Sequence, residues 1–101
     1  MGDLFKNVEG FEWDSGNISK NWKKHKITNK ESEEAFLDKF LLTGRDVKHS
    51  TYEARRLLYG QSKKGKYLAI SFTFRLNFIR IISARQMNKK ERELYEKQKN
   101  K

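Results

Sequence analysis

Regular alternation of apolar and polar residues in the second half of the chain is the feature that most constrains its fold. Within residues 66–74, every second residue from Leu68 to Phe74 is large and apolar, so these side chains share one face of a strand. Over residues 78–83, Ile79 and Ile81 face one way, and Phe78, Arg80 and Ile82 face the other. Only residues 75–77 separate the two segments, and a connection that short allows an antiparallel hairpin but no parallel crossover.

A third strand is predicted over residues 53–59, before a short turn at residues 60–65. The turn and the lysine after it match the spacing of a phosphate-binding loop, but Tyr67 stands where such a loop needs Ser or Thr. We therefore interpret the segment as a lysine-rich hairpin turn. The three strands then form an antiparallel meander.

Helices are predicted on either side of this meander. Asp14 is a candidate N-cap for a helix over residues 14–25. Its core-facing side is expected to hold Ile18, Trp22 and His25, which recur at helical spacing. Both tryptophans, Trp13 and Trp22, are expected to belong to the core rather than to a binding surface.

Two capping boxes predict the other helices. Thr28 and Glu31 open a helix that extends to residue 40, and Asn88 and Glu91 open a last helix, with fraying expected over residues 97–101. The second helix is expected to bury three residues: Ala35, Phe36 and Phe40. The polar residues 43–51 are predicted to form a loop.

The element order predicts one α+β domain over residues 1–101. Residues 10–14 add a short strand or extended segment, so the sheet has three to four antiparallel strands and about three helices. The helices are expected against one face of the sheet, which leaves the opposite face open and polar. The core of the domain is expected over residues 10–96, followed by a basic tail at residues 97–101.

Charge restricts the class of partner. The chain has 23 Lys and Arg against 13 Asp and Glu, a formal charge of +10 over 101 residues. Such an excess indicates a polyanionic partner. No cysteine is present, which fits the reducing cytoplasm. No secretion signal is visible and no apolar segment approaches the ~20 residues of a membrane span, so no membrane partner is expected.

The residue types favour RNA cleavage by general acid–base chemistry, without a metal or another cofactor. The two histidines have no metal-binding spacing. Attack by the RNA 2′-hydroxyl needs a base, a cation at the phosphate and an acid at the leaving 5′ oxygen. We expect Arg80 and Arg85 to hold the scissile phosphate, and Glu53 or His25 to accept the proton. Flanking phosphates are expected to contact Lys20, Lys24 and Arg55.

Each candidate also has a structural interpretation. A Glu53–Arg55 ion pair on one strand face and a half-buried His25 are about as plausible as catalytic roles. Arg80 interrupts an apolar strand, where an arginine is usually a solvated residue of the outer face, and Arg85 could cap the edge of the sheet.

Four segments resemble the BrnT family of toxins: FEWD at residues 11–14, KH at 24–25, EEA at 33–35 and RIISAR at 80–85. The resemblance extends over residues 11–96. It implies a fold like that of RelE-type ribonucleases and an RNA substrate. It also implies an antitoxin partner, BrnA, with a ribbon-helix-helix domain. In the complex that the two proteins form, DNA is then bound only through the antitoxin.

The chain departs from this family pattern at several positions. Asn17 stands where a lysine is usual, and Lys26 where a glycine commonly follows the KH pair. The hairpin at residues 74–77 lacks its usual glycine. These departures keep a second hypothesis open: a non-enzymatic basic binding module, which is a decayed toxin acting as co-repressor with its DNA-binding partner.

Overall fold

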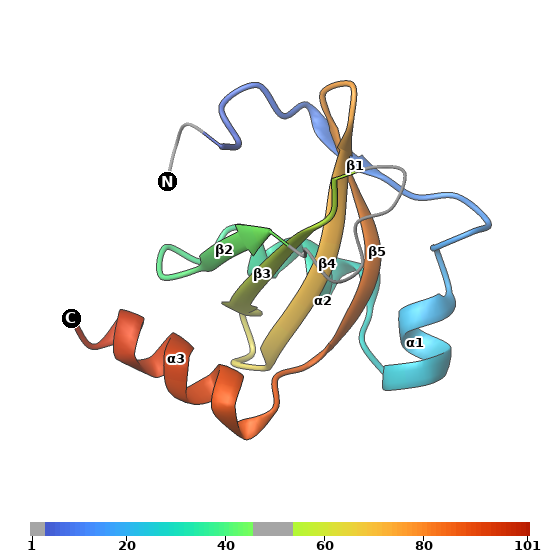
Figure 1. Ribbon diagram of the computed structural model, residues 1–101. Coiled ribbons are helices and arrows are strands. Elements are labelled where there is room, and N and C mark those ends of the chain that lie inside the picture. The colour runs from blue at the N-terminus through green and yellow to red at the C-terminus, as the bar shows by residue number, and fades with distance from the viewer. Residues whose placement is uncertain (1–3, 46–53) are drawn as a thin grey trace.

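The computed structural model describes residues 4–45 and 54–101. His49 and Glu53 lie outside the described residues. A five-stranded sheet, in the order β1-β5-β4-β3-β2, forms the centre of the molecule (Figure 1). The strands are β1 (Gly10–Glu12), β2 (Leu42–Arg45), β3 (Arg56–Gln61), β4 (Tyr67–Arg75) and β5 (Phe78–Gln86). The helices are α1 (Lys20–His25), α2 (Asn29–Ala35) and α3 (Lys89–Lys99).

The predicted antiparallel meander is confirmed. β3 pairs with β4 and β4 with β5, both antiparallel. A bulge lies between Ser71 and Phe72, which pair with Ser83 and Ile81 and leave Ile82 without a partner across the ladder. The extra residue shifts the alternation of β5 by one position.

The β4–β5 hairpin closes through an unusual residue. Leu76 has a φ of 54° at the turn, in the left-handed region that favours glycine. The turn of residues 62–66 at the other end of β4 is a hairpin turn, as predicted, in which Ser62 donates its N–H to the Lys66 carbonyl at 3.0 Å.

Two features of the predicted sheet are wrong. The sheet is mixed, because β1 runs parallel to β5 and pairs Glu12 with Arg80. It also gains β2, an antiparallel partner of β3, from residues that we expected to form a loop. β1 and β5 lie far apart in sequence, so hairpin geometry gives no signal for their pairing. β2 is an edge strand, where polar residues are tolerated because one side faces solvent.

The second helix begins as predicted and ends early. The Thr28 hydroxyl accepts from the Glu31 N–H, and the Glu31 carboxylate accepts from the Thr28 N–H. The helix ends at Ala35 instead of continuing to residue 40, so Phe40 is only partly buried. Ala35 lies against β3: a Cβ on Gly60 would come within 2.7 Å of the Ala35 carbonyl oxygen.

α1 presents the opposite face from the one predicted. Ile18 and Trp22 are 50% and 51% exposed, while Asn17 and Asn21 are buried. Beyond the end of β1, the edge of β5 has backbone groups that no strand pairs. Asn17 Nδ2 donates to the Ile81 carbonyl at 3.0 Å, and Asn21 Oδ1 accepts from the Ala84 N–H at 2.9 Å. Apolar side chains could not satisfy these groups. The helix also begins at Lys20, six residues after the predicted N-cap.

The helices do not all cover one face of the sheet, as we had expected. α2 packs against the core face, behind the sheet in Figure 1. In α3, Tyr95 stacks edge-on against Tyr67, which alternates with the core residue Leu68 and so points to the other face. α3 is helical to Lys99, whose ammonium donates to Gln61, so the predicted fraying over residues 97–99 is not observed.

The core lies between the sheet and α2. Leu58, Leu68, Ile70, Phe72 and Ile81 are fully buried there. Phe36 meets Phe5, Phe11 and Phe72 in edge-on ring contacts. In the part of the chain that the structure describes, no helix has the length and apolar character needed to cross a membrane.

Candidate functional site

Arg80 lies at the centre of a group of charged side chains on the face of the sheet opposite the core. The parallel pairing of β1 with β5 places Glu12 beside it. Arg80 Nη1 donates to Glu12 Oε1 at 3.1 Å and to Asp14 Oδ2 at 2.8 Å, and Nη2 donates to Asp14 Oδ1 at 3.1 Å. The Arg80 side chain is only 14% exposed. Its guanidinium is therefore held in one orientation by two carboxylates.

Glu12 is shared between two arginines. Its Oε1 also lies 3.5 Å from Nη1 of Arg75, the last residue of β4. The Glu12 and Asp14 side chains are 36% and 51% exposed, and that of Arg75 is 47% exposed. We call these four residues, Glu12, Asp14, Arg75 and Arg80, the β1–β5 charge cluster. A solvent-borne molecule can reach both signs of charge in it.

The ionisation of the cluster is set by its internal hydrogen bonds. The Arg80 guanidinium, with help from the Gly16 N–H, holds the pKa of Asp14 below its ordinary value of 3.8. The same hydrogen bond to Asp14 raises the pKa of Arg80. Both groups are therefore charged at neutral pH.

The turn into α1 continues the cluster. A Cβ on Gly16 would lie 3.1 Å from Arg80 Nη2, so this turn lies directly against the guanidinium. The Lys20 ammonium donates to the Ile82 carbonyl at 3.4 Å, which places the predicted phosphate ligand beside β5. Lys24 is exposed and His25 is half-buried at the end of the same helix.

Arg85 points to the same face as Arg80 but belongs to a different group. Its two terminal nitrogens donate to the two Glu91 oxygens at 2.7 and 2.8 Å, and this bond raises the pKa of Arg85 and lowers that of Glu91. Arg80 pairs with Thr73 and Arg85 with Ala69, four residues apart on β4. At ~3.3 Å per residue this separates the two arginines by about 13 Å. The structure does not bring them to one point.

The other predicted residues are placed only in part. Arg55 is half-buried just before β3. The carbonyl of its neighbour Ala54 accepts from the Thr73 hydroxyl at 3.0 Å. Because Thr73 is the cross-strand partner of Arg80, this segment lies on the cluster's side of the sheet. Glu53, a predicted proton acceptor, lies outside the described residues, so no structural role is assigned to it.

Sequence reasoning missed three members of the cluster: Glu12, Asp14 and Arg75. The two acids flank Trp13 within the FEWD segment. Their alternation around an apolar residue was the available signal, since it places both on the polar face of an extended segment. The sequence gives no signal for the pairing of this segment with β5, which brings Arg80 beside the two acids. Trp13 is half-buried and donates its indole N–H to Glu33 at 2.7 Å.

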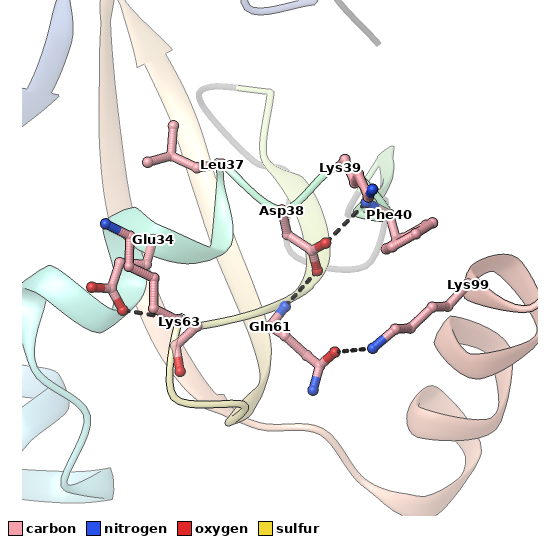
Figure 2. A pocket seen from close by; sticks show the side chains of 9 residues that line it. Glu34, Leu37, Asp38, Lys39, Phe40, Gln61, Lys63 and Lys99 are labelled. Carbon is pink, nitrogen blue, oxygen red and sulfur yellow. Dashed lines mark hydrogen bonds between the residues drawn. The ribbon is translucent and has the colours of Figure 1, made fainter.

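A hollow of about 310 Å³ at the opposite end of the sheet has a structural role (Figure 2). It lies between α2, the β3–β4 turn and the end of α3. Asp38 accepts from the backbone N–H groups of Phe40 and Gln61 and from the Tyr95 hydroxyl. Burial, and then Asp38, raise the pKa of Tyr95, which keeps this donor protonated. These polar groups join α3 to the sheet. Among residues 4–45 and 54–101, no three His, Cys, Asp or Glu side chains are arranged to hold a metal ion.

A family model matches most of the chain. The family described as the ribonuclease toxin BrnT of type II toxin–antitoxin systems matches residues 13–91. The matched region includes Asp14, α1 and the whole of β5, and therefore most of the charge cluster. No curated protein matches the chain.

Proposed function

Because the chain belongs to the BrnT family of ribonuclease toxins, we propose that its β1–β5 charge cluster binds and cleaves RNA without a metal ion. The observation that supports this proposal is the 3.1 Å contact between Glu12 and Arg80. It places a carboxylate and a guanidinium, the two groups that phosphodiester cleavage needs on the attacking side, next to each other on an accessible surface.

The proposed reaction uses the RNA's own 2′-hydroxyl. Arg80, with Arg75, binds the scissile phosphate and stabilises the charge that develops on its oxygens. Glu12 takes the proton as the 2′ oxygen attacks phosphorus. The bond to the 5′ oxygen breaks, and a protonated group returns a proton to that oxygen. Glu53 and His25, the proton acceptors predicted from the sequence, stay alternatives to Glu12 as the base.

The remaining predicted residues have supporting roles in the proposal. Lys20, Lys24 and Arg55 bind flanking phosphates. Arg85 binds a phosphate further along the strand, if it leaves Glu91. We further propose a RelE-like fold, action in the cytoplasm, and neutralisation by a ribbon-helix-helix antitoxin that makes the only contact with DNA.

The test is RNA cleavage by purified variants in the presence of EDTA. We expect wild-type protein to cleave, and R80A and E12Q to lose at least about 100-fold in rate, as is typical when a charge-stabilising group or a general base is removed. R45A is the matched control, since Arg45 is an exposed arginine on β2, at the other edge of the sheet. It removes the same charge and should keep full activity.

Three results would redirect the proposal. Loss of wild-type activity in EDTA would contradict metal independence. If R85A loses cleavage activity and R80A keeps it, the active site lies nearer to α3 than proposed. No cleavage by wild-type protein, together with intact binding to its antitoxin, would favour the non-enzymatic module. In that case Glu12 and Asp14 are simply structural partners that neutralise Arg80.

A further inference from the structure

Trp22 exposes half of its surface in the middle of a basic segment. Residues 15–30 contain five lysines and no acidic residue. The Trp22 side chain is 51% exposed on α1, and the Lys26 ammonium lies 5.2 Å from the centre of its ring. An indole left half in water costs hydrophobic free energy. The sequence pattern had assigned this residue to the core, so its exposure needs another explanation.

The position of Trp22 is fixed by the face of α1 that packs on the sheet. Asn21, its neighbour, is 1% exposed and bonds to the edge of β5. Trp22 therefore lies on the solvent side, as do Ile18 before the helix and Lys26 at its C-cap. The edge contacts thus hold α1 with an aromatic ring directed outward and lysines around it.

We propose that Trp22 is a stacking platform for an unpaired RNA base, with the lysines of α1 binding the phosphates on either side. Aromatic side chains within basic surfaces bind single-stranded nucleic acid in this way, because every base has a face that can stack. This inference rests on the proposed function and names a second contact of the same substrate.

The basic segment begins beside the charge cluster. The turn before α1 touches Arg80 at Gly16, and Lys20 lies over β5 at Ile82. Trp22 follows Lys20 by two residues on the same helix. In the proposal, an RNA strand with a phosphate at Arg80 passes Lys20 and crosses to the solvent side of α1, where the indole lies. The charge of this surface favours RNA over a protein partner, for which Ile18 and Trp22 offer only a small apolar patch.

The experiment measures binding separately from cleavage. Titration of short single-stranded oligouridylate into R80A, at a concentration where cleavage is absent, is followed by tryptophan fluorescence. We expect quenching of the emission that is missing in W22F/R80A. In anisotropy titrations, W22A should weaken binding by about 5- to 150-fold, the range for loss of one stacked base, and W22F by less.

L94A is the matched control, because Leu94 is a large apolar residue with 49% exposure on α3. It should bind as wild type. We expect the Trp22 variants to fold, because Trp22 is exposed. Circular dichroism checks the fold of each variant. An unchanged RNA affinity in W22A overturns the inference and reassigns the indole and Ile18 to a protein contact. If wild-type protein does not cleave RNA but W22A still loses affinity, the proposed function fails and this inference stands.

Discussion

Asn17 connects three parts of the chain through one buried amide. Its Nδ2 donates to the Glu12 and Ile81 carbonyls, each at 3.0 Å, and its Oδ1 accepts from the Asp14 N–H at 2.8 Å. The side chain therefore joins the end of β1 to β5 and fixes the turn that leads into α1. Where the resemblance led us to expect a lysine, Asn17 has a structural role at the junction of β1 and β5.

N17A should lower the free energy of unfolding by about 2–3 kcal/mol, because it leaves two carbonyls and one N–H without their partner. N17D keeps the shape but places carboxylate oxygens against carbonyl oxygens, and should be at least as destabilising. Urea unfolding measures both. N7A is the control, since Asn7 is exposed, and should stay within about 0.5 kcal/mol of wild type. A stable N17D would show that shape, not hydrogen bonding, matters at this position.

At the residue scale, sequence patterns showed which face of the sheet a side chain lies on better than they showed which residues it bonds to. Arg80 was correctly placed on the outer face, because alternation with Ile79 and Ile81 determines it. Its carboxylate partners could not be derived, since Glu12 is 68 residues away and meets it only through a parallel pairing. Trp22 was misplaced because the apolar stripe of a short helix was assumed to face a core, whereas α1 faces unpaired backbone.

α3 is joined to the sheet by an ion pair that also belongs to its N-terminal cap. The Glu91 carboxylate accepts from Arg85 and from the Asn88 N–H at 2.9 Å. Arg85 first, and then the Asn88 N–H, lower the pKa of Glu91 from its ordinary value of 4.5. A carboxyl whose pKa is lower in the folded state contributes stability above its unfolded-state pKa, and this contribution is lost as pH falls through the folded-state pKa.

E91Q removes the charge but keeps a side chain that completes a capping box. We expect it to lower the free energy of unfolding by about 1–2 kcal/mol at pH 7, since the Glu91 side chain is mostly buried and that of Arg85 is half-exposed. The difference from wild type should shrink below pH 4.5 and vanish when Glu91 of the wild type is protonated. Urea titrations between pH 3 and 7 test this, with E93Q as an exposed control on the same helix. A difference independent of pH would indicate lost packing instead.

At the element scale, local signals predicted well and distant pairings did not. Both capping boxes and the β4–β5 hairpin follow from residues within a few positions of each other. The short strand predicted within residues 10–14 is present as β1, but its parallel pairing with β5 was missed. β2 was missed because a polar edge strand has no alternation long enough to detect. The end of α2 was missed because residues 36–40 contain no glycine or proline that would mark it.

The molecule as a whole has a net charge of +10, and in the proposed function this charge is organised along α1. The logarithm of RNA affinity should then fall linearly with the logarithm of salt concentration, with a slope near −0.7 for each phosphate neutralised. K20Q/K23Q/K24Q should reduce the magnitude of this slope by about 2.

K64Q/K89Q/K90Q is the matched control for the salt experiment. It removes the same charge from the β3–β4 turn and from α3, where the three lysines are also exposed. Its slope should stay near that of wild type. Equal losses in the two triple variants would show that net charge alone, and not the position of α1, determines RNA binding.

The pairing of β1 with β5 has a consequence for the order of events during synthesis. Glu12 leaves the ribosome 68 residues before Arg80, and the two meet only when almost the entire chain has emerged. A nascent or truncated chain that ends before β5 holds the acids without the arginine and has no edge for Asn17 and Asn21 to bond. The charge cluster is therefore absent from every product that ends before β5, and in the proposed function such a product is harmless to the cell that makes it.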